Sequence, residues 1–474
     1  MRMSKKFLSG SSRILQRKPI GSTRFLIVGL SFFAVFVASL GFAGSAQRAP
    51  QQSATTTSAA RNAALVAATT EVLKETSGIR QLSILRPVQS STQSRAEIER
   101  ELIKNLDEDM TASQLHASEV ALRKLGLVSS DFQYRSLMIR LLTEQVAGYY
   151  DPKTQQFHLA DWIDLDGQKP IMAHELTHAL QDQHFNLRRF EHWPKGDSDA
   201  ELAAHALIEG DATLAMALYV ANNPLRVLTF LKSLAATGMP SEELDKSPRA
   251  LRETLLFPYQ EGEKWVSVLY KLEGWDRVSK AFADLPQSTE QILHPEKYLA
   301  HESPVKLTLA DVSSTLNASA PGASWRRIDS DVNGEWGFYL ILDQFLKSPA
   351  ESRRAAAGWG GDRFALYENA RGEAMLVSLS AWDTEADARE FFDAYIKRTE
   401  LRYPAAAAND AGFDAETSMP SKSFVTAEGL VSIELRGSRV LILEGVPAKA
   451  DIKSLKAMCW RGTETQTQRA ARRT

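Results

Sequence analysis

Two histidines and a glutamate lie at a spacing that can bind and use a metal ion: His174-Glu175-Leu176-Thr177-His178. Residues four apart share one face of a helix, so both imidazoles can reach the same ion. Glu175 follows the first histidine and can hold a metal-bound water from the side. Zinc suits this arrangement, because it accepts nitrogen ligands in a tetrahedral shell and can leave one position to water. The motif therefore predicts a zinc ion, with Glu175 as the group that activates the water.

The residues around this motif predict a helix over residues 171–186. Pro170 precedes this segment, at a position where a first helical turn tolerates proline. Leu176 and Leu180 supply apolar packing beside the histidines. The alternative is a buried structural helix whose histidines bond to backbone or carboxylate groups. Two histidines at ligand spacing around a glutamate favour the metal site.

A catalytic zinc ion usually has three protein ligands and a water, so a third ligand must lie elsewhere in the chain. Glu209 is the first candidate, because it lies on a predicted second helix, 197–220, that can pack antiparallel to the first. Glu201 and His205 share its face at four-residue steps and stay open as alternatives. The other reading of this face is a solvated acidic stripe.

His184 is a further candidate, ten residues after His174, at the spacing of the zinc-protease pattern HExxHxxGxxH. That pattern needs a glycine where this chain has Gln181, because glycine lets the backbone turn sharply out of the helix. Gln181 favours a continued helix, which carries His184 away from the metal. We therefore expect His184 at the helix end or in a supporting role.

Length and composition limit the function classes. A chain of 474 residues is long enough for two or three domains, and 44% hydrophobic with 24% charged residues is ordinary for a globular protein. The net charge of −2 gives no reason to expect nucleic acid as a partner. Cys459 is the single cysteine, which excludes an internal disulfide and a thiolate metal cage; we interpret it as incidental.

The N-terminus predicts export. Residues 1–24 are basic, and residues 25–43 form an uncharged, mostly apolar run that fits either a signal-peptide core or a single membrane anchor. The charge asymmetry places the N-terminus in the cytoplasm and everything after residue 46 outside the cytoplasmic membrane. No cysteine follows the run, so a lipid anchor is not expected.

The rest of the chain divides by pattern into a linker, helical segments and a C-terminal domain with alternating strands. Helices are expected at 96–106, 115–125, 225–235 and 265–272, and a β-hairpin at 145–160 just before the metal helix. The C-terminal part is expected to hold strands near 363–368 and 374–380, a helix at 385–398 and a hairpin at 430–443. The expected division is a flexible linker 44–70, a helical region 71–145, a metal-binding core 146–300, a crossing near 301–325, a C-terminal α+β domain 326–457 and a disordered tail 458–474.

With these residues, the segment 145–300 resembles the gluzincin class of zinc metallopeptidases, in a branch of uncharacterised exported bacterial proteins. The resemblance implies an α+β fold with a largely helical zincin-like domain and a small sheet. It implies His174 and His178 as zinc ligands, Glu209 as third ligand and Glu175 as general base. One departure concerns Thr213, because many gluzincins have there an Asp that orients the first histidine. Either Asp211 or Asp182 takes its place, or this branch of the class differs at that position.

The expected function is hydrolysis of peptide bonds in a peptide or protein substrate, on a chain bound to the membrane through its N-terminal segment or released from it. Zinc lowers the pKa of its water, and Glu175 takes the proton and delivers it to the leaving amine. The oxyanion needs a further donor. His294 is our candidate, and Tyr259, Tyr149 and Tyr150 stay open. The alternatives are a non-catalytic binding protein with this fold and a zinc hydrolase of non-peptide amides or esters.

Overall fold

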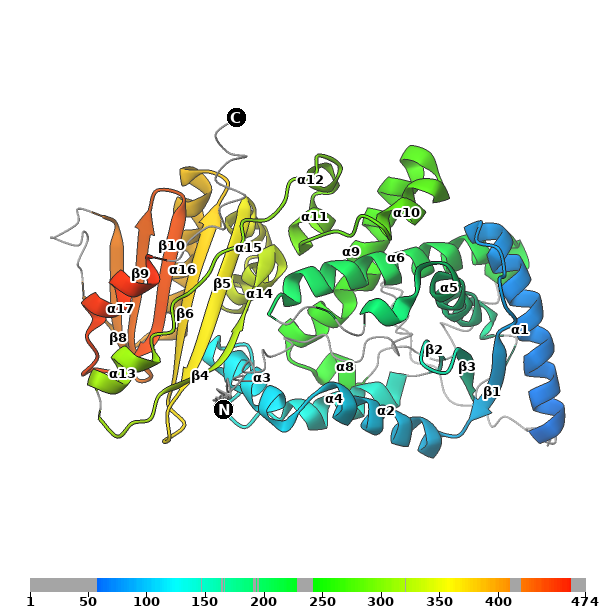
Figure 1. The fold of residues 1–474 in the computed structure, drawn as a ribbon, viewed down its shortest axis with the longest axis horizontal. Helices are drawn as coiled ribbons and strands as arrows, with labels where there is room; N and C mark the ends of the chain where they lie inside the picture. Colours follow the sequence, from blue (N-terminus) through cyan, green and yellow to red (C-terminus); the bar gives the residue numbers. More distant parts are fainter. Residues whose placement is uncertain are drawn as a thin grey trace, which may run out of the picture.

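A helical half and a sheet half lie side by side in the computed structural model (Figure 1). The structure describes residues 58–145, 147–162, 165, 167–190, 193, 196–227, 242–319, 321–409 and 419–461. The predicted α+β class is confirmed. Among these residues no helix is long and apolar enough to cross a membrane. The basic segment 1–24 and the apolar run 25–43 lie outside the described residues.

The helical half contains most of the helices and the small sheet. Its longer helices are α1 (Ser58–Arg80), α2 (Arg95–Asp109), α3 (Ala112–Lys124), α4 (Tyr134–Gln145), α5 (Lys169–Phe185), α6 (Ser198–Ala221) and α9 (Arg249–Glu273). Its shorter helices are α8 (Glu242–Lys246), α10 (Trp275–Ala281), α11 (Thr289–Leu293), α12 (Pro295–Leu299) and a 3-10 turn at Leu187–Phe190. The helix predicted at 265–272 is the last part of α9, which continues through Pro258. Most of the helix predicted at 225–235 lies outside the described residues.

The expected flexible linker is wrong for residues 58–70, which belong to α1. Alanine is the strongest helix former, so the alanine-rich composition of this segment favours a helix over a linker. Leu65, Val72 and Leu73 are buried against α5 and the end of α6, so tertiary packing stabilises the helix in addition to helix propensity. The expected tail also begins too early, because α17 (Ile452–Cys459) ends inside it and buries Cys459.

The small sheet has the strand order β1-β3-β2. The predicted hairpin is present as β2 (Gly148–Asp151) and β3 (Gln156–Ala160), which pair antiparallel. The third strand, β1 (Gln89–Gln93), pairs parallel with β3 and lies in a region expected to be helical throughout. Its sequence, QSSTQ, has no apolar alternation, so the period-2 pattern that identifies strands is missing.

The sheet half contains a seven-stranded antiparallel sheet in the order β4-β5-β6-β10-β9-β8-β7. Its strands are β4 (Arg326–Asp331), β5 (Trp359–Glu368), β6 (Ala374–Trp382), β7 (Ala407–Asn409), β8 (Ser421–Thr426), β9 (Gly429–Arg436) and β10 (Arg439–Val446). Its helices are α13 (Ser313–Ser319), α14 (Gly334–Leu346), α15 (Pro349–Ala356), α16 (Glu385–Arg402) and α17. The expected crossing at 301–325 thus contains α13.

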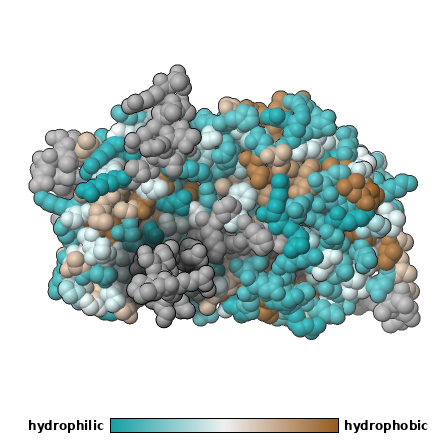
Figure 2. Space-filling model, in the orientation of Figure 1, coloured by the Kyte–Doolittle hydropathy of each residue, from teal (hydrophilic) through white to brown (hydrophobic). Residues whose placement is uncertain are grey.

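The two faces of this sheet belong to two different cores, as the alternation of strand side chains requires. Phe364 and Leu366 of β5 join the large core that also contains α14, α16 and the helical half. Ala365 and Tyr367, the residues between and after them, join a smaller core with α13 and α17. The sheet is therefore the wall between the two cores. On the outer surface shown in Figure 2, hydrophilic residues prevail and hydrophobic ones occur as separate patches.

A buried ion cluster fastens the helical half to the sheet half. The Glu444 carboxylate on β10 accepts hydrogen bonds from Arg398 at 2.6 Å and Arg402 at 3.1 Å, both on α16. Arg398 also donates to the carbonyl of Leu125, and Arg402 to that of Lys124, at 2.6 Å each. The two arginines thus satisfy carbonyls at the end of α3, where helices leave them without partners.

Glu444→Gln is expected to destabilise the protein by about 3–5 kcal/mol, because it leaves the Arg398 guanidinium buried without its counter-charge. Burial alone raises the pKa of Glu444, but Arg398 and Arg402 outweigh it and lower the pKa to about 2. The stabilisation is therefore complete above the ordinary glutamate pKa and is lost as the pH falls toward 2. Thermal unfolding between pH 3 and 7 measures both effects. The control is Glu428→Gln. The Glu428 carboxylate pairs with Arg402 in the same cluster but is half-exposed, so its loss should lower the free energy of unfolding by less than about 1 kcal/mol.

Candidate metal centre

Helix α5 presents the two histidines of the motif on one face. Pro170 lies in its first turn, and Asn186 ends it in a left-handed conformation with φ of 55°. The rings of His174 and His178 lie 4.8 Å apart and nearly perpendicular, and both residues are buried. The predicted helix 171–186 is therefore present, with the imidazoles directed to one point.

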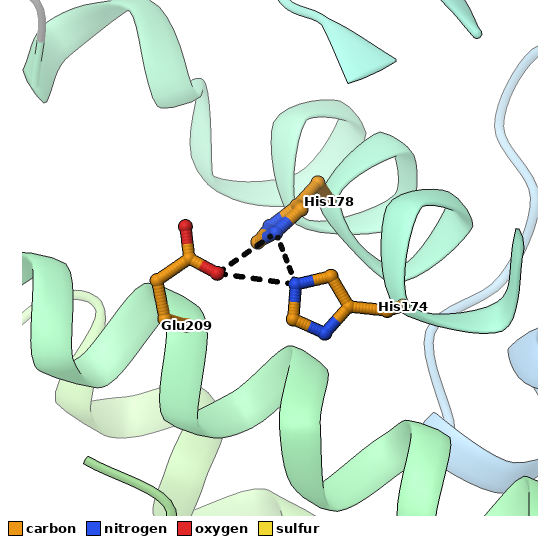
Figure 3. A group of neighbouring side chains, drawn as sticks. All are labelled: His174, His178 and Glu209. Atoms are coloured by element: carbon orange, nitrogen blue, oxygen red, sulfur yellow. Dashed lines mark hydrogen bonds and ion pairs between the residues drawn. The ribbon is translucent and has the colours of Figure 1, made fainter. Parts of the chain in front are cut away.

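Helix α6 brings Glu209 to the same point (Figure 3). Its Oε2 lies 3.1 Å from Nε2 of His174 and 3.3 Å from Nε2 of His178, and the two nitrogens are 3.1 Å apart. Donors on a tetrahedral zinc ion with bonds of about 2.0–2.1 Å are separated by roughly 3.3 Å. We call these three atoms the donor triangle. Its size and its two-nitrogen, one-oxygen composition fit zinc.

The electrostatics of the donor triangle favour a positive charge inside it. Burial lowers the pKa of His178, but the adjacent Glu209 carboxylate outweighs burial and raises the pKa to about 9. Burial raises the pKa of Glu209, but the histidines outweigh it and lower the pKa to about 2. In the absence of a metal, a proton therefore stays between the histidines and the carboxylate. A divalent cation in the donor triangle would supply two positive charges where the proton supplies one.

Two glycines let helices α6 and α9 cross closely beside the donor triangle. A Cβ on Gly210 would lie 2.3 Å from the backbone of Gly262, and one on Gly262 would lie 2.2 Å from the carbonyl oxygen of Ala206. This approach brings Tyr259 of α9 to the triangle, where its ring stacks on His174 with centroids 6.1 Å apart. Burial, then the charges of Glu209 and Glu175 and a hydrogen bond to Glu209, raise the pKa of Tyr259.

Gly210→Ala is expected to lower stability by about 3 kcal/mol and to reduce zinc binding, because the two helices must separate beside Glu209. Gly78→Ala is the matched control: Gly78 also lies inside a helix, but a Cβ there meets nothing within 4 Å. Helix propensity alone predicts that the Gly78→Ala control raises the free energy of unfolding by about 0.5–1 kcal/mol. Thermal unfolding gives the stability of the two variants, and zinc content gives their metal binding. Equal effects at both positions would contradict the role of the crossing.

Gln181 fixes which nitrogen of His178 faces the donor triangle. Its amide nitrogen donates to the carbonyl of Ile208 at 3.0 Å and to Asp211 at 2.9 Å. Its oxygen is therefore the acceptor for Nδ1 of His178, which lies 2.8 Å away. With Nδ1 protonated, Nε2 of the neutral ring keeps its lone pair for a metal. The residue that separates this motif from the longer histidine pattern thus has a structural role of its own.

The support for His178 extends to α1 through Arg80. Asp211 accepts from Gln181 through one oxygen and from Nε of Arg80, at 2.5 Å, through the other. Arg80, Asp211 and Gln181 are fully buried. Arg80 also donates to Ser279 and lies over the ring of Trp275, both on α10. We call Arg80, Asp211 and Gln181 the support chain. No sequence pattern pointed to Arg80, since a lone arginine at the end of a helix is common.

Glu175 lies beside the triangle and is held by β2. Its Oε2 accepts the backbone N–H of Tyr150 at 2.9 Å, and burial raises the pKa of this carboxyl group. The Tyr150 hydroxyl donates to Asp182, which also accepts from Arg86. Asp182 therefore orients the strand that holds Glu175, and Asp211 acts on His178 through Gln181. Within the described part of the chain, neither of them bonds to His174.

The other ligand candidates lie outside the donor triangle. His184 bonds to the carbonyl of Ser83 at 2.8 Å, on the chain between α1 and β1. Glu201 and His205 lie two turns and one turn, respectively, before Glu209 on α6, and within the described residues only Glu209 meets both histidines. A second acidic group, Glu290, Glu302 and Asp383, surrounds the ammonium of Lys297, so a cation already lies at its centre.

The four candidate oxyanion donors separate clearly. Tyr259 lies at the triangle, whereas the Tyr149 hydroxyl donates to Gln93 and that of Tyr150 to Asp182. His294 pairs with Glu335 of α14 at 3.0 Å. His294 follows α11, and Thr289 of α11 donates a hydrogen bond to Asp199 of α6. Asp199 precedes Glu209 by ten residues, which is about 15 Å along the helix. The geometry therefore favours Tyr259 and gives His294 a structural partner elsewhere.

Comparison with known proteins reaches only the sheet half. Residues 324–456 match a family described as "Domain of unknown function (DUF8575)", a segment that runs from β4 into α17. No curated protein and no solved structure matches the chain.

Proposed function

We propose that this chain is a zinc-dependent metallopeptidase that hydrolyses peptide bonds outside the cytoplasmic membrane. The observation that carries the proposal is the buried donor triangle of His174, His178 and Glu209, with Glu175 beside it. The buried contacts behind His178 support it further, because ligands of catalytic metals are commonly oriented by such partners.

His174, His178 and Glu209 are the residues that would hold the ion. When bound, zinc supplies a water of lowered pKa and polarises the carbonyl of the bond to be cleaved.

The remaining steps belong to side chains of this chain. The N–H of Tyr150 fixes one oxygen of Glu175, which leaves the other to take a proton from the attacking water and to deliver it to the leaving amine. The Tyr259 hydroxyl, protonated at neutral pH, would turn from its hydrogen bond to Glu209 to donate to the oxyanion. The burial of Glu175 and Tyr259 strengthens both interactions, since little water screens them.

The test combines metal content with cleavage. The purified full chain is expected to bind about one zinc ion and to cleave casein or a mixture of quenched peptides. A chelator should remove both properties, and added zinc should restore both. A folded chain that binds no zinc, or a zinc-loaded chain that cleaves no member of a broad peptide mixture, would overturn the proposal.

Export is part of the same proposal and rests on the apolar run at 25–43 and the basic residues before it. A reporter enzyme that is active only outside the cytoplasm, fused after residue 474, should be active. An inactive reporter on a stably produced fusion would contradict export.

A further inference from the structure

Asp182, near the end of α5, binds two other segments of the chain. Its Oδ2 accepts a hydrogen bond from the Tyr150 hydroxyl of β2 at 2.9 Å and one from the Arg86 guanidinium at 2.8 Å. Its Oδ1 accepts the backbone N–H of Leu187 at 3.1 Å. Asp182 and Tyr150 are buried, whereas the Arg86 side chain is 36% exposed. Both oxygens of this carboxylate are therefore occupied, and one of them is shared by a tyrosine and an arginine.

Tyr150 connects Asp182 to Glu175. The two carboxylates lie seven residues apart, which is two turns and about 10 Å along one face of α5. The backbone N–H of Tyr150 donates to Oε2 of Glu175 at 2.9 Å, and the hydroxyl at its other end donates to Asp182. A tyrosine side chain has only two χ angles, so fixing its hydroxyl also restricts its backbone. Tyr150 is thus bound to α5 at both ends.

The strand that carries Tyr150 depends on this second contact. β2 has four residues and lies at the edge of the small sheet in the described part of the chain. An edge strand has one side without ladder hydrogen bonds, so contacts with other elements must fix that side. The bond from the Tyr150 hydroxyl to Asp182 is such a contact with α5. The N–H that holds Glu175 is therefore placed through Asp182.

Arg86 lies in the connection between α1 and β1, and two consecutive residues of α5 bind it. Its guanidinium pairs with Asp182. The Gln183 side chain accepts the backbone N–H of Arg86 at 3.1 Å and donates to its carbonyl, also at 3.1 Å. Both the backbone and the side chain of Arg86 are thus fixed. A buried carboxylate is unfavourable without a counter-charge, and Arg86 supplies that charge to Asp182.

We infer that Arg86 is a positioning residue for the general base Glu175 and acts through Asp182 and Tyr150. The inference rests on the proposed function, because it takes Glu175 to be the base. We call Arg86, Asp182 and Tyr150 the base clamp. It complements the support chain, since Arg80 at the end of α1 acts on a metal ligand and Arg86, six residues later, acts on the base. The end of α1 and the connection after it thus support both functional groups of α5.

The experiment measures kcat, KM and zinc content on the zinc-loaded full chain, with one quenched peptide that the wild-type chain cleaves. Tyr150→Phe keeps the ring and the backbone N–H and removes only the hydroxyl. We expect kcat to fall about tenfold with KM and zinc content unchanged, because the base is displaced while the metal ligands are untouched. Tyr149→Phe is the matched control, since the hydroxyl of this neighbouring buried tyrosine donates to Gln93 instead. It should change kcat by less than about twofold.

A double-mutant cycle tests the role of Arg86. Arg86→Gln should lower kcat about threefold in the wild-type chain and should have no further effect in the Tyr150→Phe chain, since residues that act through one set of contacts are not additive. A general loss of stability would lower the unfolding temperature without this coupling. The same factor in both backgrounds would overturn the inference, because Arg86 would then act independently of Tyr150.

Amide hydrogen exchange of strand β2 gives a readout that does not depend on cleavage. Exchange should be faster in Tyr150→Phe and Arg86→Gln than in the wild-type chain and Tyr149→Phe, because the N–H that Glu175 accepts loses its fixed strand. This separates positioning from a direct contact of the Tyr150 hydroxyl with the substrate. Unchanged exchange, or equal kcat for Tyr150→Phe and Tyr149→Phe, would overturn the base clamp and leave the peptidase standing. A zinc-loaded wild-type chain that cleaves nothing overturns the peptidase itself.

Discussion

Glu175→Gln is expected to abolish measurable peptide cleavage while the chain still binds about one zinc ion. Glutamine keeps an oxygen for the N–H of Tyr150, so the position of the side chain is retained. It cannot take a proton from water, and a general base contributes about 10²–10⁴-fold to the rate. Zinc content and cleavage of quenched peptides, measured on the same preparation, give the two quantities.

Glu201→Gln is the control for this prediction. Glu201 is another buried carboxylate, two turns before Glu209, and it lies outside the donor triangle. Its replacement should leave zinc content unchanged and cleavage within about threefold, apart from any loss of stability. A zinc-loaded Glu175→Gln chain that retains more than about a tenth of the wild-type rate would exclude Glu175 as the base.

Arg80→Gln is expected to weaken zinc binding by about 10–100-fold, the usual effect of removing a partner that orients a metal ligand. The change leaves Asp211 buried without its cation, so Gln181 loses one fixed acceptor and the ring of His178 loses its orientation. Zinc affinity is measured by competition with a chelator, at a temperature where the variant is folded. Arg80→Lys, which keeps the charge, should recover part of the affinity.

Glu75→Gln separates orientation of the ligand from simple attachment of α1. Glu75 also connects α1 to the α6 region, through a bidentate pair with Arg226, and within the described residues it forms no hydrogen bond with the support chain. Its loss should lower the unfolding temperature slightly and leave zinc affinity unchanged. If Glu75→Gln weakens zinc binding as much as Arg80→Gln, α1 acts only by covering α5 and the support chain has no specific role.

The sequence allowed the metal helix and its partner helix to be predicted because their signals are local. The spacing of His174 and His178 and the apolar residues between them define the helix and its face without any distant contact. Glu209 required one assumption, that the next helix packs antiparallel, and the structure brings it to 3.3 Å or less from both histidines.

The missed parts of the site depend on contacts between distant segments. Arg80 and Asp211 are 131 residues apart, and neither has a neighbour in sequence that reveals the other. The Gly210–Gly262 approach is equally invisible, because a glycine inside a helix normally only weakens it. His294, our predicted oxyanion donor, pairs instead with the Glu335 carboxylate of α14, which no local pattern indicates.

The bonds from α16 to the end of α3 span 273 and 278 residues, which is more than half of the chain. During synthesis α3 leaves the ribosome long before these arginines exist, so its last carbonyls meet only water until α16 follows. Helices α2, α3 and α4 also share one apolar core with α6, α9 and α14. A chain that ends before α16 therefore carries the complete metal motif but lacks the arginines that satisfy the end of α3.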